Sequence, residues 1–249
     1  MGTPLTPYGP EAGGTKREQV SQMFDRIAPK YDFLNHLFSL GIDVIWRRKA
    51  VRLLRQERPK KILDMATGTA DFALETRRMM GPDVHITGVD ISPGMLEIGR
   101  KKVRQRNWST SIELVEGDSV SLPYPDGSFD AYTVAFGVRN FENLPGGLLE
   151  MRRVLRPGGW GVILEFSKPR RFPMKQLFGL YFRWIMPTLG RWISKDAQAY
   201  SYLPESVAIF PEGQAFVDIL RDAGYVSIRT LPLTGGIATI YLAQVPAGS

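Results

Sequence analysis

The alternation of apolar and polar positions divides the chain into a helical beginning and a longer part in which strand-like and helical patterns alternate. Residues 16–58 carry apolar side chains at helical spacing. Pro29 and Gly41 are expected to break this segment into shorter helices. The recurring apolar positions include Val20, Met23, Phe24, Ile27, Trp46, Val51 and Leu54.

From Lys60 onward, short apolar runs are separated by amphipathic stretches, which is the rhythm of a parallel sheet with right-handed crossovers. The last two apolar runs flank Thr234, Gly235 and Gly236, and this spacing predicts an antiparallel hairpin at the sheet edge. Strand-like runs occupy residues 60–66, 84–91, 111–118, 129–136, 159–167, 225–233 and 237–245, and helical patterns occupy 72–80, 95–106 and 144–155. The pattern therefore predicts an α/β fold.

The first fifteen residues, MGTPLTPYGPEAGGT, are rich in Pro and Gly and lack the charged and apolar regions of a secretory signal. We expect residues 1–15 to form a flexible tail outside the fold. The remaining residues, 16–249, are sufficient for one large domain with a full core.

The chain has no cysteine, which excludes disulfides, thiolate zinc sites and a cysteine nucleophile, and which fits a cytoplasmic compartment. Its two histidines, His36 and His85, are far apart in the sequence. We therefore expect no metal site.

The sequence DMATGTAD, residues 64–71, follows the first predicted strand, where ligands approach an open α/β sheet. Dinucleotide-binding loops use three glycines to bring backbone N–H groups to a pyrophosphate, whereas this loop contains only Gly68. Asp64 and Asp71 bracket it, and like charges a few Å apart repel by about 1 kcal/mol even when screened. The loop therefore favours a cationic ligand, S-adenosylmethionine, over a diphosphate, with Asp64, Thr67 and Gly68 as expected contacts.

Two further carboxylates end the next two predicted strands. Asp90, twenty-two residues after Gly68, is expected to accept hydrogen bonds from both ribose hydroxyls. Asp118 could accept from the adenine amino group while the Ser119 backbone N–H donates to the ring. Alternatively, Asp118 and Ser119 simply cap a turn.

Two longer motifs carry a closer resemblance. The chain reads YDFLNHLFSLGIDVIW over residues 31–46 and RVLRPGGWGVILEFSKP over residues 153–169. With these motifs it resembles the class I methyltransferases, and more closely the family that C-methylates the quinone ring in menaquinone and ubiquinone biosynthesis. The matching positions are Tyr31, Asp32, Asn35, Ser39, Gly41, Trp46, Arg153, Val154, Leu155, Pro157, Gly158, Gly159, Glu165 and Ser167.

The resemblance runs from about Lys16 to Val245 and includes FGVRN at 136–140 and AYSYLPES at 199–206. The chain departs from the family pattern at Leu34, where Met is usual, and at Asp43, where many relatives have His. The departure at Asp43 rules out a catalytic histidine at that position.

The resemblance implies a Rossmann-like, seven-stranded, mostly parallel sheet with one antiparallel edge strand. It also implies a helical lid over residues 16–58 and a helical insertion over residues 170–200, after the fifth strand. The implied activity is S-adenosylmethionine-dependent C-methylation of a prenylated hydroquinone, demethylmenaquinol. Methylation of the benzoquinol precursor of ubiquinone is the alternative.

The resemblance also indicates where catalysis takes place. Methylation of an electron-rich ring carbon needs alignment rather than a covalent enzyme nucleophile. Arg139 could stabilise a forming phenolate, or position a water or carboxylate that takes the proton, while Asn140 orients the ring. Alternatively, Arg139 pairs structurally with an acid such as Asp32.

Tyr31, Asp32 and Asn35 lie at helical spacing on the expected lid. They could close over the cofactor and exclude water, with Asp32 as a catalytic candidate, or they could brace the lid. His36 lies in the same motif, and a structural role is the favoured interpretation for it.

The net charge of +7 is unevenly distributed: ten basic residues and one acid, Glu165, lie between Arg152 and Lys195. Such a patch allows contact with an anionic membrane or with nucleic acid. An RNA-binding protein or RNA methyltransferase is a distant alternative, because no aromatic RNA motif is recognisable and a cysteine for C5 methylation of pyrimidines is missing. We therefore expect no nucleic-acid partner; a homodimer is left open.

Within the basic stretch, residues 172–194 form an apolar stripe that is interrupted by Pro187 and by charged residues, so it is unsuited to crossing a bilayer. Three interpretations remain: peripheral contact with an anionic membrane, ordinary core, or a tunnel for the prenyl tail. The stripe consists of Leu177, Tyr181, Trp184, Ile185, Leu189 and Trp192.

Overall fold

The centre of the protein is a seven-stranded sheet, seen here in a computed structural model that describes residues 5–181, 184 and 197–248. The strands are β1 (Lys61–Met65), β2 (His85–Asp90), β3 (Ile112–Glu116), β4 (Phe129–Ala135), β5 (Leu155–Phe166), β6 (Val226–Leu233) and β7 (Ala238–Gln244). Six of them fall on segments where the sequence predicts a strand, and β5 begins four residues before its predicted start, at a residue expected to end the preceding helix.

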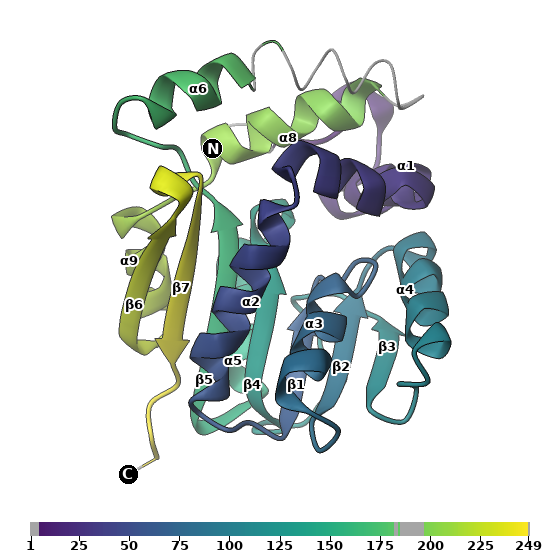
Figure 1. Cartoon of the computed structure of the whole chain (residues 1–249), viewed down its shortest axis with the longest axis vertical. Coiled ribbons are helices and arrows are strands. Elements are labelled where there is room, and N and C mark those ends of the chain that lie inside the picture. Colours follow the sequence, from purple (N-terminus) through teal and green to yellow (C-terminus); the bar gives the residue numbers. More distant parts are fainter. Residues whose placement is uncertain (1–4, 182–183, 185–196, 249) are drawn as a thin grey trace.

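The strand order is β3-β2-β1-β4-β5-β7-β6, and β1 to β5 are parallel. After β3 the chain crosses to the other side of β1 to form β4 (Figure 1). The loops after β1 and β4 therefore leave the sheet in opposite directions. This is the place at which open α/β sheets bind ligands.

The predicted hairpin is present, with the 3₁₀ turn η4 (Thr234–Gly236) between β6 and β7. The structure refines the position of the antiparallel strand: β7 pairs with β5 and lies one place inside the edge, while β6 is outermost. Burial explains this order. Six of the seven residues of β7 are buried, whereas the residues of β6 are exposed or partly exposed except for Leu233, as suits a solvent-facing edge.

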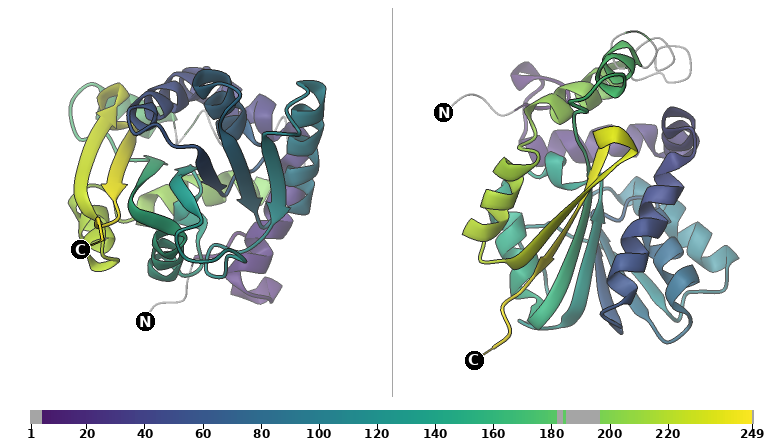
Figure 2. Two further views of the ribbon diagram at one scale, coloured as in Figure 1. Left: turned by 90° about the horizontal axis from the view of Figure 1, so that it is seen from below. Right: turned by 60° about the vertical axis from the view of Figure 1, so that its left-hand side comes forward.

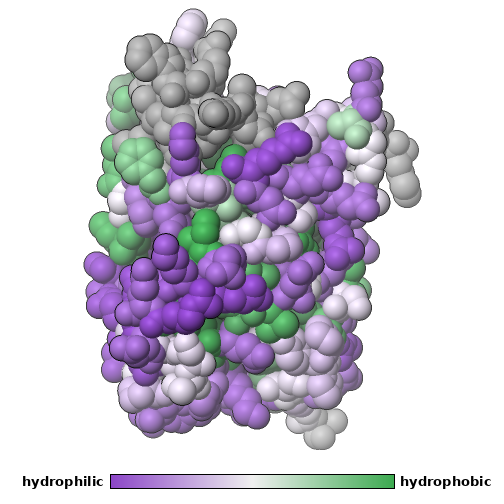
Figure 3. Space-filling model, turned by 90° about the vertical axis from the view of Figure 1, so that its right-hand side faces the viewer, coloured by the Kyte–Doolittle hydropathy of each residue, from purple (hydrophilic) through white to green (hydrophobic). Residues whose placement is uncertain are grey.

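Helices cover both faces of the sheet. The helices α2 (Ile42–Arg55), α3 (Asp71–Met80) and α4 (Pro93–Gln105) lie on one face, and α5 (Leu144–Arg153) and α9 (Gln214–Asp222) on the other (Figure 2). Neighbouring strand residues serve opposite cores: Ile62 packs with α2 and α3, and Leu63 packs with α5 and α9. The face that carries α4 is largely hydrophilic (Figure 3).

Among the described residues, three further helices lie beyond the carboxyl ends of the strands: α1 (Lys16–Ser39), α6 (Met174–Leu180) and α8 (Ala197–Ile209) (Figure 1). The expected break at Gly41, which has a positive φ of 74°, is confirmed. The break at Pro29 is wrong, because α1 continues through it. The helix α1 packs on Tyr202 of α8 through Val20 and Met23. The lid predicted over residues 16–58 is therefore limited to α1, because α2 packs on a face of the sheet.

The segment that was expected to be a tail is partly built into the fold, and this prediction is corrected for residues 5–15. Leu5 and Tyr8 pack against the α1–α8 cluster, and a short 3₁₀ helix, η1, covers Pro10–Ala12. The buried Gln19 side chain donates to the carbonyls of Gly9 and Gly13 and accepts from the Tyr8 backbone N–H. The Gln19 carboxamide thus supplies hydrogen bonds to backbone groups of a segment in which Pro and Gly disfavour regular secondary structure.

The expected helical insertion at 170–200 is seen in part, as α6 and the first turn of α8. Ile185, Leu189 and Trp192 of the predicted apolar stripe lie outside the described residues. In the part of the chain that the structure describes, no helix has the length and apolar character needed to cross a bilayer.

Candidate functional site

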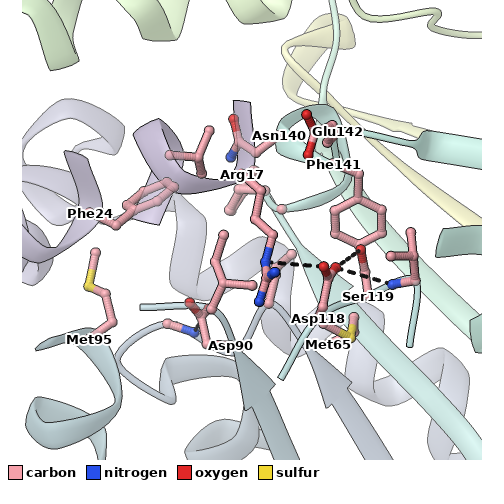
Figure 4. A pocket seen from close by; sticks show the side chains of 18 of the residues that line it. Arg17, Phe24, Met65, Asp90, Met95, Asp118, Ser119, Asn140, Phe141 and Glu142 are labelled. Carbon is pink, nitrogen blue, oxygen red and sulfur yellow. Dashed lines mark hydrogen bonds and ion pairs between the residues drawn. The ribbon is translucent and has the colours of Figure 1, made fainter. Parts of the chain in front are cut away.

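A cavity of about 280 Å³ lies between the lid helix α1 and the carboxyl ends of the central strands. Its wall consists of α1, the loops after β1, β2 and β3, and residues 135–143 after β4. Arg17 and Phe24 reach it from the lid, and Asp90 and Asp118 face it from the strand ends (Figure 4). The cavity thus occupies the switch point of the sheet.

The loop after β1 forms one wall of the cavity. Gly68 has a φ of +55°, and a Cβ added there would meet no atom within 4 Å, so the loop presents open backbone to the cavity. The Gly68 N–H donates to Asp90 Oδ2 at 2.8 Å, which fixes the loop against the end of β2. Two alanines of the loop, Ala66 and Ala70, are also left-handed.

Asp64 does not reach the cavity, although the sequence assigned it to cofactor binding. Its two carboxylate oxygens accept hydrogen bonds of 2.6 Å from the hydroxyls of Thr67 and Thr133. Burial raises the pKa of Asp64 to about 6, although the hydrogen bonds from these hydroxyls stabilise the ionised carboxylate and act to lower the pKa. Asp64 and Thr67 therefore support the loop from beneath, and neither lies in the cavity wall.

Asp90 does face the cavity, as the sequence predicted. Its Oδ2 is held by the Gly68 N–H and its Oδ1 accepts from the Ser92 N–H at 2.9 Å. Burial raises the pKa of Asp90 to about 6, and the two N–H donors oppose that rise. The carboxylate is therefore fixed in place and retains free lone pairs for hydroxyl donors.

Asp118 and Ser119 also line the cavity, at the end of β3. Asp118 Oδ1 accepts from the Val120 N–H at 3.2 Å, so the turn-capping interpretation holds for that oxygen. Its Oδ2 lies 3.1 Å from Arg17 Nε of the lid (Figure 4). Asp118 thus caps a turn with one oxygen and presents the other to the cavity.

Of the two residues after β4 that were expected to act in catalysis, Asn140 faces the cavity and Arg139 does not. Asn140 lines the cavity, and in the described part of the chain its buried Oδ1 has no hydrogen-bond partner. Arg139 points away from the cavity wall: its Nη1 lies 2.9 Å from Glu165 Oε1 and also donates to the Phe136 carbonyl. The pairing interpretation of Arg139 is therefore correct in kind, but its partner is Glu165 rather than Asp32.

The Arg139–Glu165 ion pair is buried. Glu165 is fully buried, and burial raises its pKa, although the Arg139 guanidinium opposes that rise. Removing one partner would leave a buried, uncompensated charge on the other. The pair therefore fixes the segment that carries Asn140.

Asp32, also predicted to be catalytic, braces the lid instead. It accepts from Lys102 Nζ of α4 at 2.7 Å and from the Thr69 hydroxyl at 2.5 Å, and it is absent from the cavity wall. Lys102 Nζ also forms an ion pair with Asp71 Oδ1 at 2.6 Å, so the charge of the second acid of the DMATGTAD loop is balanced by a lysine. Of the predicted lid residues, Tyr31 does line the cavity.

His36 and Asp43 lie near each other, outside the cavity wall. His36 Nδ1 is 3.2 Å from Asp43 Oδ2, and Asp43 also pairs with Arg47 one turn along α2. These contacts join the end of α1 to α2. They support the structural interpretation of His36.

The carboxylates that give the cavity its negative charge are not the pair that brackets the DMATGTAD loop. Asp64 and Asp71 are engaged elsewhere, whereas Asp90, Asp118 and Glu142 line the cavity together with one basic residue, Arg17. The cavity still carries an excess of carboxylates, which disfavours a diphosphate.

Several residues that hold the lid were not predicted. Lys16 Nζ donates to the Phe141 carbonyl at 3.1 Å and to the Arg139 carbonyl at 3.4 Å, and burial lowers the pKa of Lys16. On the other side, Asp25 accepts from the Ser92 hydroxyl at 2.6 Å and from the Gly94 N–H at 2.8 Å. Lys16 lies at the border of the assumed tail, so only the three-dimensional arrangement reveals these contacts.

Comparison with known proteins settles the family. A sequence profile of the ubiE/COQ5 methyltransferase family matches residues 13–244. The chain belongs to this family. A demethylmenaquinone methyltransferase from Bacteroides fragilis is 49% identical over 239 residues, which cover 96% of each chain. A ubiquinone/menaquinone biosynthesis C-methyltransferase, UbiE, from Geotalea uraniireducens is 44% identical and covers 92% of this chain and 97% of its own.

The fold comparison agrees with this assignment. The crystal structure of a SAM-dependent methyltransferase from Thermotoga maritima matches with a TM-score of 0.64 and 17% identity, covering 90% of this chain and 98% of the other. At this identity the likeness shows the fold alone. The class I methyltransferase architecture predicted from the sequence is thereby confirmed.

Proposed function

We propose that this chain transfers the methyl group of S-adenosylmethionine to a ring carbon of demethylmenaquinol, a prenylated hydroquinone, giving menaquinol. The supporting observation is a carboxylate-lined cavity at the switch point of the sheet, in a chain that is nearly half identical over almost its whole length to a relative named for this activity. The ubiquinone precursor is the alternative substrate, because other relatives are named for both pathways.

The donor set fits the cofactor. Asp90 has free lone pairs for the two ribose hydroxyls, and Asp118 Oδ2 is placed to accept from an amino group once Arg17 moves. The open backbone at Gly68 allows the rest of the molecule to approach closely. When bound, S-adenosylmethionine supplies an electrophilic methyl group on a positively charged sulfur, which suits a cavity with excess carboxylates.

The protein's part in the reaction is positioning. Loss of a proton from a ring hydroxyl makes the neighbouring carbon more nucleophilic, and alignment of the reacting groups can supply about 7 to 11 kcal/mol. Asn140 faces the cavity and is available to orient a ring hydroxyl. Arg139 and Glu165 hold the segment that carries Asn140, and α1 excludes water from above. Arg139 is therefore a positioning residue.

The test is transfer of label from radioactive S-adenosylmethionine to demethylmenaquinol by the purified full chain in liposomes, under a reductant. We expect label in the extracted quinol, and more of it than with the benzoquinol precursor assayed in parallel. A faster reaction with the benzoquinol would assign the chain to the ubiquinone pathway. Failure with both quinols would contradict the proposal.

We also propose that α6 contacts an anionic lipid surface, where a prenylated substrate resides. None of the seven residues of α6, all of them described, is buried, and Phe172 and Trp184 beside it are 81% and 62% exposed. Arg171 and Lys175 are exposed in the same stretch, and residues 166–181 contain no acid. Aromatic and basic side chains of this kind suit the headgroup region of an anionic bilayer.

A further inference from the structure

Arg17, in the first turn of the lid helix α1, reaches across the cavity to the end of β3. Its Nε lies 3.1 Å from Asp118 Oδ2, and both residues line the cavity (Figure 4). The other oxygen of that carboxylate, Oδ1, accepts from the Val120 N–H at 3.2 Å and from the Ser119 hydroxyl at 3.4 Å. Oδ2 is therefore the oxygen that Asp118 presents to a ligand, and the Arg17 side chain occupies it.

The Arg17–Asp118 pair differs from the contact that holds the lid near its other end. There, Asp32 bonds Lys102 of α4, and neither of these residues lines the cavity. That contact can therefore persist when a ligand is bound. The Arg17–Asp118 pair joins two residues of the cavity wall, so a ligand that uses Asp118 Oδ2 must displace Arg17.

The exposure of the two side chains shows which of them gives way. The side chain of Arg17 is 53% exposed, whereas that of Asp118 is 22% exposed and is held by the turn that it caps. The guanidinium can therefore turn into water while the carboxylate stays in place. Ion pairs that are open to solvent are weak, because water and salt screen them, so a ligand can break this one.

We infer that Arg17 competes with the adenine amino group of the donor for Asp118 Oδ2, an inference that rests on the proposed function. The guanidinium and the amino group are both N–H donors, and they are alternatives at this one acceptor. Arg17 thus lowers the affinity of the cavity for adenosyl ligands. Adenosylhomocysteine, the spent donor, carries the same adenine, so the return of Arg17 to Asp118 favours its release.

The experiment measures the Kd for adenosylhomocysteine by calorimetry, with the full chain and with Arg17→Met. Met keeps much of the length of the Arg side chain but has no N–H to donate. Arg104→Met is the matched control. Arg104 lies 3.1 Å from Glu97, its side chain is 59% exposed, and it is outside the cavity wall. Both substitutions therefore remove one positive charge and one exposed ion pair of the same length.

We expect Arg17→Met to lower the Kd for adenosylhomocysteine about two- to fivefold, which is the range for an exposed ion pair that no longer competes. Arg104→Met should leave this Kd within about 1.5-fold of wild type. In an Asp118→Asn background, Arg17→Met should change the Kd by no more than about 1.5-fold, because the charge that holds Arg17 is already absent.

An unchanged Kd for Arg17→Met would overturn the inference, and so would a higher Kd, since Arg17 would then contribute to binding. Tighter binding that persists in the Asp118→Asn background would also overturn it, because the new Met side chain rather than the lost ion pair would be responsible. The proposed function survives each of these results as long as the wild type binds adenosylhomocysteine. A wild type that does not bind it would contradict the proposed function, and the inference with it.

Discussion

Replacement of Asp90 by Asn should weaken cofactor binding strongly. The Asp90 carboxylate is held at the cavity by the N–H groups of Gly68 and Ser92, and its remaining lone pairs face the space assigned to the ribose. An Asn side chain keeps one carbonyl oxygen but replaces the other with an NH₂ group. That group cannot accept from either backbone N–H or from a ribose hydroxyl.

The magnitude follows from the charge that is lost. Hydrogen bonds to an ionised group contribute about 1.5–3 kcal/mol, whereas neutral ones contribute about 1 kcal/mol. Loss of one charged hydrogen bond to the ribose should therefore weaken binding about 10- to 100-fold. The loop would also loosen, because the NH₂ group would face the N–H of Gly68 or of Ser92.

The assay is calorimetric titration with adenosylhomocysteine at a temperature well below the Tm of each variant. Asp64→Asn is the control, because Asp64 belongs to the same layer of strand ends but bonds only Thr67 and Thr133 among the described side chains. We expect its Kd to stay within about threefold of wild type, which is less than 1 kcal/mol. Equal weakening by the two substitutions, or no weakening by Asp90→Asn, would refute the assignment of Asp90 to the ribose.

Three further predictions concern stability and lipid binding. The folded-state pKa of Asp64, about 6, exceeds its ordinary 3.8, so the folded protein takes up a proton that the unfolded chain does not as pH falls from 6 to 4. Asp64→Asn should therefore raise the free energy of unfolding at pH 7.5 by up to about 3 kcal/mol and at pH 4 by less than about 1 kcal/mol, as measured by urea unfolding; a loss of stability at pH 7.5 would contradict this. Phe136→Gly should be about 1 kcal/mol more stable than Phe136→Ala, because a left-handed φ is strained for any residue with a Cβ; the opposite order would remove the strain argument. Cosedimentation with vesicles that contain anionic lipid should fall with added salt and with Lys175→Glu, and the contact assigned to α6 would be wrong if neutral vesicles bound equally well.

Most of the fold could be predicted from the sequence because period-two and period-3.6 patterns report which face of each element is buried. The error at Pro29 shows the limit of local rules, since α1 continues through this residue. The tail prediction failed because it rested on Pro and Gly content alone. The segment is ordered by contacts with residues further along the chain, namely the hydrogen bonds of Gln19 and the packing of Leu5 and Tyr8. The inner position of β7 could have been read from its apolar run, which is longer than that of β6.

The site was predictable for Asp90, Asp118 and Ser119, which follow the strand ends into the cavity wall, but not for Asp64, whose carboxylate turns to Thr67 and Thr133. It was not predictable where the direction depends on a distant partner. Arg139 turns toward Glu165, twenty-six residues away, and Asp32 turns toward Lys102, seventy residues away. The left-handed backbone of Phe136 is likewise a feature that composition does not reveal.

The position of the transferred methyl group shows whether the cavity presents a methyl donor to the ring of a quinol. Demethylmenaquinol is incubated with the full chain and S-adenosylmethionine bearing a trideuterated methyl group, and the product is examined by mass spectrometry and NMR. We expect a single trideuteromethyl group on a ring carbon. A product labelled on oxygen, or a quinol recovered without label while the protein binds the donor, would contradict it.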